Sequence, residues 1–334
     1  MIGRELRLRI VSAVVLAIPV LALTWFGGVW FRCFAAVLGL LIYYEFAGMA
    51  DLKSREPAER IVGWGAVALA GLMVAIGWPG SALIVVLVGA AIAALPALRH
   101  RTAPWAAVAI LYSGLFAITL AGVRGAGFYG LYAMLFIIAI VWATDILAYF
   151  CGRAIGGRKL APAISPGKTW SGALFGAGAG VAAGLLVALT LRQGGSFAVP
   201  LIALALSVAS QCGDLFESWI KRKFSVKDSS RLIPGHGGVM DRVDGLVFAV
   251  FAAFILALVM PAMTTGPASG ELAARLLGNY GHKVSCDVRP HRYSGGRGTG
   301  RRLMEFLTGI WGLLTGYILP FLVVLTIVVF FHEL

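Results

Sequence analysis

Charged side chains are scarce in this sequence. Asp, Glu, Lys and Arg together make up 13% of its 334 residues, whereas apolar residues make up 60%. Soluble domains carry about 25% charged residues, and intrinsically disordered chains have low hydrophobicity. Both classes are therefore excluded, and the composition predicts an integral membrane protein.

Cysteine pairs are also lacking. The four cysteines form no C-x-x-C pair, and three of them lie in or beside apolar stretches, so the sequence suggests neither a disulfide framework nor a zinc ribbon. They are Cys33, Cys151, Cys212 and Cys286.

The charge that is present is mostly positive, with 28 Lys and Arg against 15 Asp and Glu. An excess of positive charge can indicate nucleic-acid binding. In a chain this apolar it more often indicates contact with anionic lipid and sets the orientation in the membrane. We therefore expect a lipid bilayer, and no nucleic acid, as a partner.

Long apolar runs dominate the rest of the chain. A helix of about 20 apolar residues crosses a bilayer, so the runs predict an all-α polytopic protein with nine core spans and one extra C-terminal helix. The expected spans lie at roughly 10–26, 30–49, 61–78, 81–98, 105–121, 130–151, 171–191, 197–219, 245–263 and 306–331.

One span repeats glycine at every fourth position. Small residues at this spacing let helices approach closely in lipid, so we interpret the repeat as a packing surface. Its members are Gly172, Gly176, Gly180 and Gly184.

Lys and Arg are distributed unequally between the connections. With the amino terminus in the cytoplasm, 18 of those up to residue 263 fall on the cytoplasmic side, and three (Arg32, Arg124 and Arg192) fall outside. The positive-inside rule favours this orientation. Two cytoplasmic loops, 152–170 and 220–244, are long and rich in Gly, Pro, Lys and Arg, so we expect the chemistry there.

The chain is expected to have four parts. Residues 1–129 form N-terminal transmembrane helices, and residues 130–263 form a catalytic transmembrane domain with both loops. Residues 264–303 carry seven Lys and Arg on the outer side, against the charge rule, and read as a flexible basic linker. Residues 304–334 form an extra helix. We expect this tail to be dispensable, and two origins fit it: a native extension and a fusion of reading frames.

The last helix ends in His332-Glu333-Leu334 and resembles the first span of a site-2 intramembrane metalloprotease. That family's H-E-x-x-H motif needs a second His one turn later, so we expect no zinc site there.

A polar face interrupts the eighth span. On a helix, Asp214, Glu217, Ser218 and Lys221 fall at positions i, i+3, i+4 and i+7, which is one face at the cytoplasmic end. Carboxylates at that depth are expensive unless they have a cation or a buried partner.

The following loop bends at glycines and re-enters the membrane at Asp241 and Asp244. Oxygen-only ligands suit Mg²⁺, and the surrounding Lys and Arg suit phosphates, so the pattern predicts a metal–nucleotide site. Taken alone, Lys221, Arg222 and Lys223 also suit a helix end anchored at lipid headgroups. His236 reads better as a hydrogen-bonded loop residue than as a metal ligand, since no second His lies nearby.

These residues carry a resemblance. The 27-residue stretch from Ser218 to Asp244 resembles the full signature of the phosphatidate cytidylyltransferase (CDP-diacylglycerol synthase) family, and the loop that follows Asp145 is similar to that family's second motif block. The first block includes Ile220-Lys221-Arg222, Lys227-Asp228, Ser230, His236-Gly237-Gly238-Val239 and Asp241-Arg242-Val243-Asp244, and the second includes Gly156-Gly157-Arg158-Lys159-Leu160 and Ser165-Pro166-Gly167-Lys168-Thr169.

The resemblance covers about residues 1–263 and implies transfer of CMP from CTP to phosphatidic acid, in a homodimer of the bacterial inner membrane with its site facing the cytoplasm. It implies that Asp214 and Asp241 hold Mg²⁺, and it allows a monovalent cation such as K⁺ beside it. We expect Asp145 to orient a basic residue or bind the metal; a helix-packing hydrogen bond is its alternative role. The expected catalytic residues are Asp214, Asp241, Lys221, Arg222 and Asp244, and the expected substrate-binding residues are Lys168, Ser165, Lys227, His236, Arg242, Asp145 and Ser218.

Two other functions fit parts of the pattern. A related membrane CTP-dependent kinase of polyprenol or diacylglycerol would also need basic loops and a metal, but the full signature argues against it. A secondary transporter would use Asp145 and Asp214 as intramembrane ion sites. It would also predict inverted repeats, and the sequence shows none.

Overall fold

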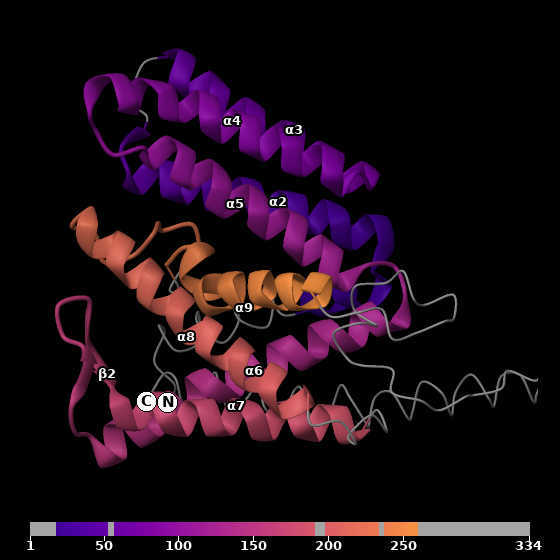
Figure 1. Ribbon diagram of the computed structural model, residues 1–334, viewed down its shortest axis with the longest axis vertical. Coiled ribbons are helices and arrows are strands. Elements are labelled where there is room, and N and C mark those ends of the chain that lie inside the picture. Colours follow the sequence, from indigo (N-terminus) through magenta and orange to yellow (C-terminus); the bar gives the residue numbers. More distant parts are fainter. Residues whose placement is uncertain (1–17, 53–56, 191–197, 234–236, 260–334) are drawn as a thin grey trace, which may run out of the picture. The chain divides into compact units, whose positions relative to one another are not determined.

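The computed structural model describes residues 18–52, 57–190, 198–233 and 237–259 (Figure 1). Eight helices in this part of the chain are long and apolar enough to cross a membrane, which confirms the all-α polytopic class. They are α2 (Gly28–Met49), α3 (Pro57–Ile76), α4 (Pro79–His100), α5 (Trp105–Arg124), α6 (Phe128–Ile155), α7 (Trp170–Thr190), α8 (Ala198–Lys223) and α9 (Met240–Val259).

These helices correspond to the second to ninth expected spans. Residues 18–26 are helical and belong to the first one, whose remaining residues lie outside the described part. The linker 264–303, the extra helix 304–334 and its protease-like ending also lie outside the described residues.

The helices pack in two neighbouring groups. Helices α2 to α5 contact one another, and α6 to α9 do the same, as the two colour ranges in Figure 1 show. Helix α5 packs against both α6 and α9, and α2 also contacts α9. The start of α9 is therefore in contact with the N-terminal helices as well as with its own neighbours.

Glycine allows the close packing of α7 on α6. The four glycines at every fourth position are all buried, and a Cβ atom added at Gly176 would lie 2.7 Å from the carbonyl oxygen of Thr144 and 2.9 Å from Cβ of Ala148. Backbone and short side chains of α6 occupy this space, so the repeat acts as the expected packing surface.

The two loops differ from their expected bounds and meet at one end of the helices. Between α6 and α7, residues 159–169 form an antiparallel hairpin of β1 (Lys159–Ala161) and β2 (Ser165–Thr169), which the sequence analysis did not predict. The second loop is shorter than expected because α8 continues to Lys223 and α9 begins at Met240. Basic residues in the last turn and Asp241 in the first turn favour these extended helix ends through the helix dipole.

We predict that Gly176→Ala destabilises the protein, whereas Gly178→Ala does not. Both changes add the same methyl group to α7 and raise helix propensity equally, but a Cβ atom at Gly178 meets nothing within 4 Å. Overpacking at Gly176 should cost about 1–3 kcal/mol. Thermal unfolding in detergent measures the difference, and equal unfolding temperatures for the two variants would contradict the packing role.

Candidate active site

The polar face of α8 forms as the helical spacing predicts. Lys221 Nζ lies 2.9 Å from Glu217 Oε2, one turn back along the helix, and Ser218 Oγ lies 3.5 Å from Asp214 Oδ1. Glu217 is 1% exposed. Its other oxygen, Oε1, is buried without a hydrogen-bond partner in the described structure, so one carboxylate oxygen of this face has unused capacity to accept.

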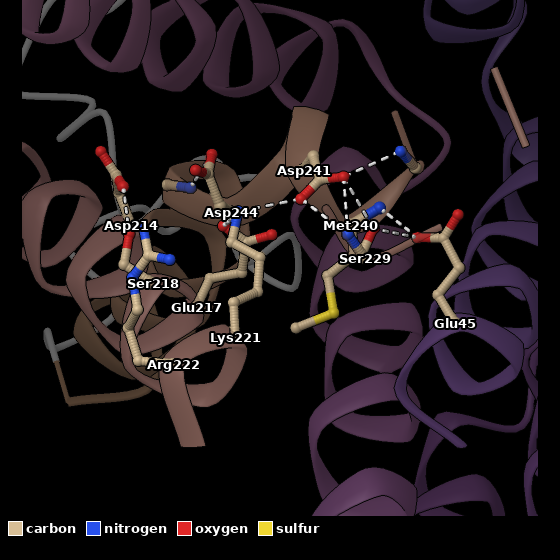
Figure 2. Close-up of polar contacts among 12 residues, drawn as sticks. Glu45, Asp214, Glu217, Ser218, Lys221, Arg222, Ser229, Met240, Asp241 and Asp244 are labelled. Atoms are coloured by element: carbon tan, nitrogen blue, oxygen red, sulfur yellow. Dashed lines mark hydrogen bonds and ion pairs between the residues drawn. The ribbon is translucent and has the colours of Figure 1, made fainter. Parts of the chain in front are cut away.

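Lys221 joins α8 to α9. Its ammonium group also lies 2.9 Å from Asp241 Oδ1, so a single cation bridges two carboxylates on different helices (Figure 2). Removing water from these acidic groups is costly, and the bridging lysine offsets that cost. The contact places Asp241, in the first turn of α9, beside Glu217, near the end of α8.

Asp241 accepts hydrogen bonds from the loop as well. The Ser229 backbone N–H donates to Asp241 Oδ2 at 3.0 Å, and the Gly238 N–H donates to the same oxygen at 2.8 Å. The Ser229 hydroxyl lies 2.9 Å from it. The loop therefore wraps around this carboxylate, with Lys221 on its other oxygen.

The hairpin reaches the same place from the other side. Lys168 on β2 forms an ion pair with Asp214 on α8, and Arg222 Nε donates to the Ile164 carbonyl oxygen at 3.4 Å. The structure therefore brings the two motif loops into direct contact, although they are about 50 residues apart in the chain.

Two further carboxylates complete an acidic cluster, which we define as Asp145, Asp214, Glu217, Asp241 and Asp244. Asp145 on α6 interacts electrostatically with Asp214, Asp244 and Lys168, and Asp244 interacts with Asp214, Lys168 and Lys221. Glycine permits this approach: a Cβ atom at Gly213 would lie 2.6 Å from the carbonyl oxygen of Asp244. The cluster thus combines α6, α8 and α9.

The remaining expected residues differ in their exposure. Ser165 is half-buried where β2 begins, opposite Ala161, while Lys227 and Arg242 are exposed. Arg222 is exposed at the end of α8. His236 lies outside the described residues.

Sequence reasoning missed Glu45 on α2. This carboxylate is 1% exposed and accepts hydrogen bonds from the backbone N–H groups of Val239 and Met240, at 2.8 and 2.7 Å. The signal was available, because an ionisable residue inside an apolar span is by default a functional candidate. Its partners lie about 190 residues further along the chain.

Known proteins are similar in sequence to most of this chain. The cytidylyltransferase family matches residues 7–260. The chain belongs to that family. A protein of Brucella abortus biovar 1 (strain 9-941) named phosphatidate cytidylyltransferase is 45% identical over 253 residues, which cover 75% of this chain and 93% of the relative.

Two other bacteria carry relatives with the same name. The protein of Bacillus subtilis (strain 168) is 39% identical over 157 residues, or 45% of this chain and 57% of the relative. That of Haemophilus influenzae (strain ATCC 51907 / DSM 11121 / KW20 / Rd) is 44% identical over 138 residues, or 37% of this chain and 44% of the relative. The family expected from the motifs is thereby confirmed.

We predict that Lys221→Met destabilises the protein and abolishes turnover, because it leaves Glu217 and Asp241 without their shared cation. Removing one partner of a buried ion pair costs about 3–5 kcal/mol. Lys223→Met is the matched control, since Lys223 is exposed two residues further along the same helix. Thermal unfolding and turnover of both variants, measured on equal amounts of inserted protein, test this; a Lys221→Met protein as stable as the control would refute the bridging role.

Proposed function

We propose that this protein transfers CMP from CTP to phosphatidate and forms CDP-diacylglycerol and pyrophosphate. The observation that carries the proposal is the meeting of both motif loops at one acidic cluster, with Lys168 paired to Asp214 and Lys221 paired to Asp241. The relatives named phosphatidate cytidylyltransferase support the same activity.

The chemistry needs cations more than it needs a base. A phosphate oxygen of phosphatidate attacks the α-phosphorus of CTP, the bond to the bridging oxygen of the β-phosphate breaks, and pyrophosphate leaves. The attacking phosphate is already ionised, so the barrier comes from bringing polyanions together. We propose that Lys168, Lys221 and Arg222 contact these phosphates, with Lys227 and Arg242 at the exposed edge of the site.

The donor set fits a hard divalent cation. The acidic cluster offers oxygen atoms only, and Glu217 Oε1 is buried without a hydrogen-bond partner in the described structure. Among the described residues, no three His, Cys, Asp or Glu side chains form a ready-made metal cage. Mg²⁺ does not require one, because it is commonly held by one or two carboxylates together with substrate phosphates.

We therefore propose that Asp214 and Asp241 hold Mg²⁺, which when bound supplies charge neutralisation at the phosphates. Asp145 and Asp244 offer further carboxyl oxygen atoms that would suit K⁺ nearby. Asp145 also interacts with Lys168, which supports its proposed role in orienting a basic residue.

The proposed setting is the bacterial inner membrane, with the site facing the cytoplasm. The distribution of Lys and Arg supports this orientation: the hairpin and the end of α8, which carry Lys159, Lys168, Lys221, Arg222 and Lys223, lie at the site. A homodimer remains a prediction from the family resemblance.

A membrane assay tests the function and the metal site together. Membranes with the full chain should convert CTP and phosphatidate to CDP-diacylglycerol and pyrophosphate only when Mg²⁺ is added, whereas a lipid kinase would release CDP.

Asp214→Asn and Asp241→Asn should each remove nearly all turnover without reducing insertion, because the amide loses the ligand charge. Wild-type turnover by Asp241→Asn at ordinary Mg²⁺ concentrations would disprove the metal assignment.

We also propose that residues 264–334 are not part of the enzyme. The family match ends at residue 260, and the Brucella abortus relative is matched over 93% of its length by 253 residues of this chain. A truncation after Met263 should insert and turn over like the full chain. Normal insertion with lost turnover would contradict the proposal and assign the tail a catalytic role.

A further inference from the structure

Within the described part of the chain, the hydrogen-bond partners of Glu45 all lie between residues 229 and 240. They are the backbone N–H groups of Val239 and Met240 and the hydroxyls of Ser229 and Ser230. Ser229, Ser230 and Val239 lie in the connection 224–239 between α8 and α9, and Met240 is the first residue of α9. A buried carboxylate of the N-terminal helices therefore holds the connection that carries the family signature.

Both oxygens of Glu45 are used. Oε1 accepts from the Val239 N–H at 2.8 Å and from the Ser230 hydroxyl at 2.7 Å, while Oε2 accepts from the Met240 N–H at 2.7 Å. These N–H groups are at the start of α9, where they have no partner within the helix and where negative charge is favoured. A glutamine at this position has one oxygen and one NH₂ group. Its NH₂ group would face one of the two backbone N–H groups, and two donors cannot form a hydrogen bond.

Ser229 connects Glu45 to Asp241. Its hydroxyl lies 3.1 Å from Glu45 Oε2 and 2.9 Å from Asp241 Oδ2 (Figure 2). A hydroxyl has one hydrogen to donate, so one serine serves two carboxylates in turn. The Ser229 backbone N–H also donates to Asp241, so the residue held by Glu45 fixes the position of that aspartate.

The glycine pair of the signature fits around this contact. A Cβ atom at Gly238 would lie 2.7 Å from each oxygen of Glu45, and one at Gly237 would lie 2.8 Å from Asp241 Oδ2. Gly237 also has a φ of 79°, in the left-handed region that favours glycine. The space that side chains would take here is filled by the Ser229 hydroxyl and the two carboxylates.

From these contacts we infer that Glu45 is a positioning residue for cytidylyl transfer. It holds Ser229 and the first turn of α9 so that Asp241 faces Lys221, and it acts through Asp241 without touching the substrate. The inference rests on the proposed role of Asp241 in holding the divalent cation.

The test compares full-length Glu45→Gln and Glu45→Asp with the control Asp51→Asn, in membranes containing equal amounts of each protein. Asp51 is exposed just beyond the end of α2, and its positive φ is one that Asn also adopts. Glu45→Gln should lower kcat about 10–100-fold, as loss of an outer partner of a metal ligand does. It should also raise the Mg²⁺ concentration for half-maximal turnover. Glu45→Asp should recover part of the loss in kcat and part of the shift in Mg²⁺ dependence. Asp51→Asn should match wild type in both measurements.

Ser229→Ala provides a second variant that keeps the two backbone contacts of Glu45. It should shift the Mg²⁺ dependence in the same direction by a smaller factor, and the double variant should be no worse than Glu45→Gln, because the Ser229 hydroxyl is one of the groups through which Glu45 acts on Asp241. Unchanged Mg²⁺ dependence in Glu45→Gln, or independent effects that multiply in the double variant, would overturn the inference. Asp241→Asn, assayed in parallel, separates the outcomes. If Asp241→Asn is inactive while Glu45→Gln is normal, only the inference about Glu45 fails. If Asp241→Asn is fully active, the proposed metal role of Asp241 fails too.

Discussion

Carboxylates in membrane-crossing helices are the constraint on which this site depends. Each is expensive at that depth unless a cation or hydrogen-bond donors compensate it. The acidic cluster includes residues from α6, α8 and α9, and two lysines from different places lie among them: Lys221 on α8 itself and Lys168 on β2. Because Lys168 belongs to the hairpin, its ion pair with Asp214 also fixes the hairpin against α8.

The start of α9 meets the same constraint in another way. Glu45 and Asp241 are both acidic and lie on either side of Ser229, and their compensation comes mainly from backbone N–H groups of the residues around the helix start. In the connection 224–239, Ser229, Ser230, Gly238 and Val239 therefore lie around two side chains. Phe224, the first residue of this connection, packs edge-on against Trp105 of α5 at a ring distance of 5.0 Å. Two residues of the N-terminal helices therefore hold the connection: Glu45 on α2 and Trp105 on α5.

The fold was largely predictable because bilayer thickness imposes span lengths that apolar runs reveal directly. The face of Asp214, Glu217, Ser218 and Lys221 was predictable for a similar reason, since helical periodicity relates residues within a few turns. The hairpin 159–169 was missed because its composition, with two prolines, two lysines and a glycine, reads as an irregular loop. Glu45 was missed because periodicity carries no information about a partner 195 residues away.

The lysines also show why sequence alone leaves part of the site open. Lys168 and Lys221 were expected to contact phosphates, and in the structure their partners are Asp214, Glu217 and Asp241. If the site binds a metal–nucleotide as proposed, phosphates that took both lysines alone would leave these carboxylates uncompensated at membrane depth. A cation that took the carboxylates alone would leave two ammonium groups without partners. A site that holds both metal and nucleotide keeps these charges paired, so the proposed complex would meet the same need for charge compensation that the ion pairs of the free site meet.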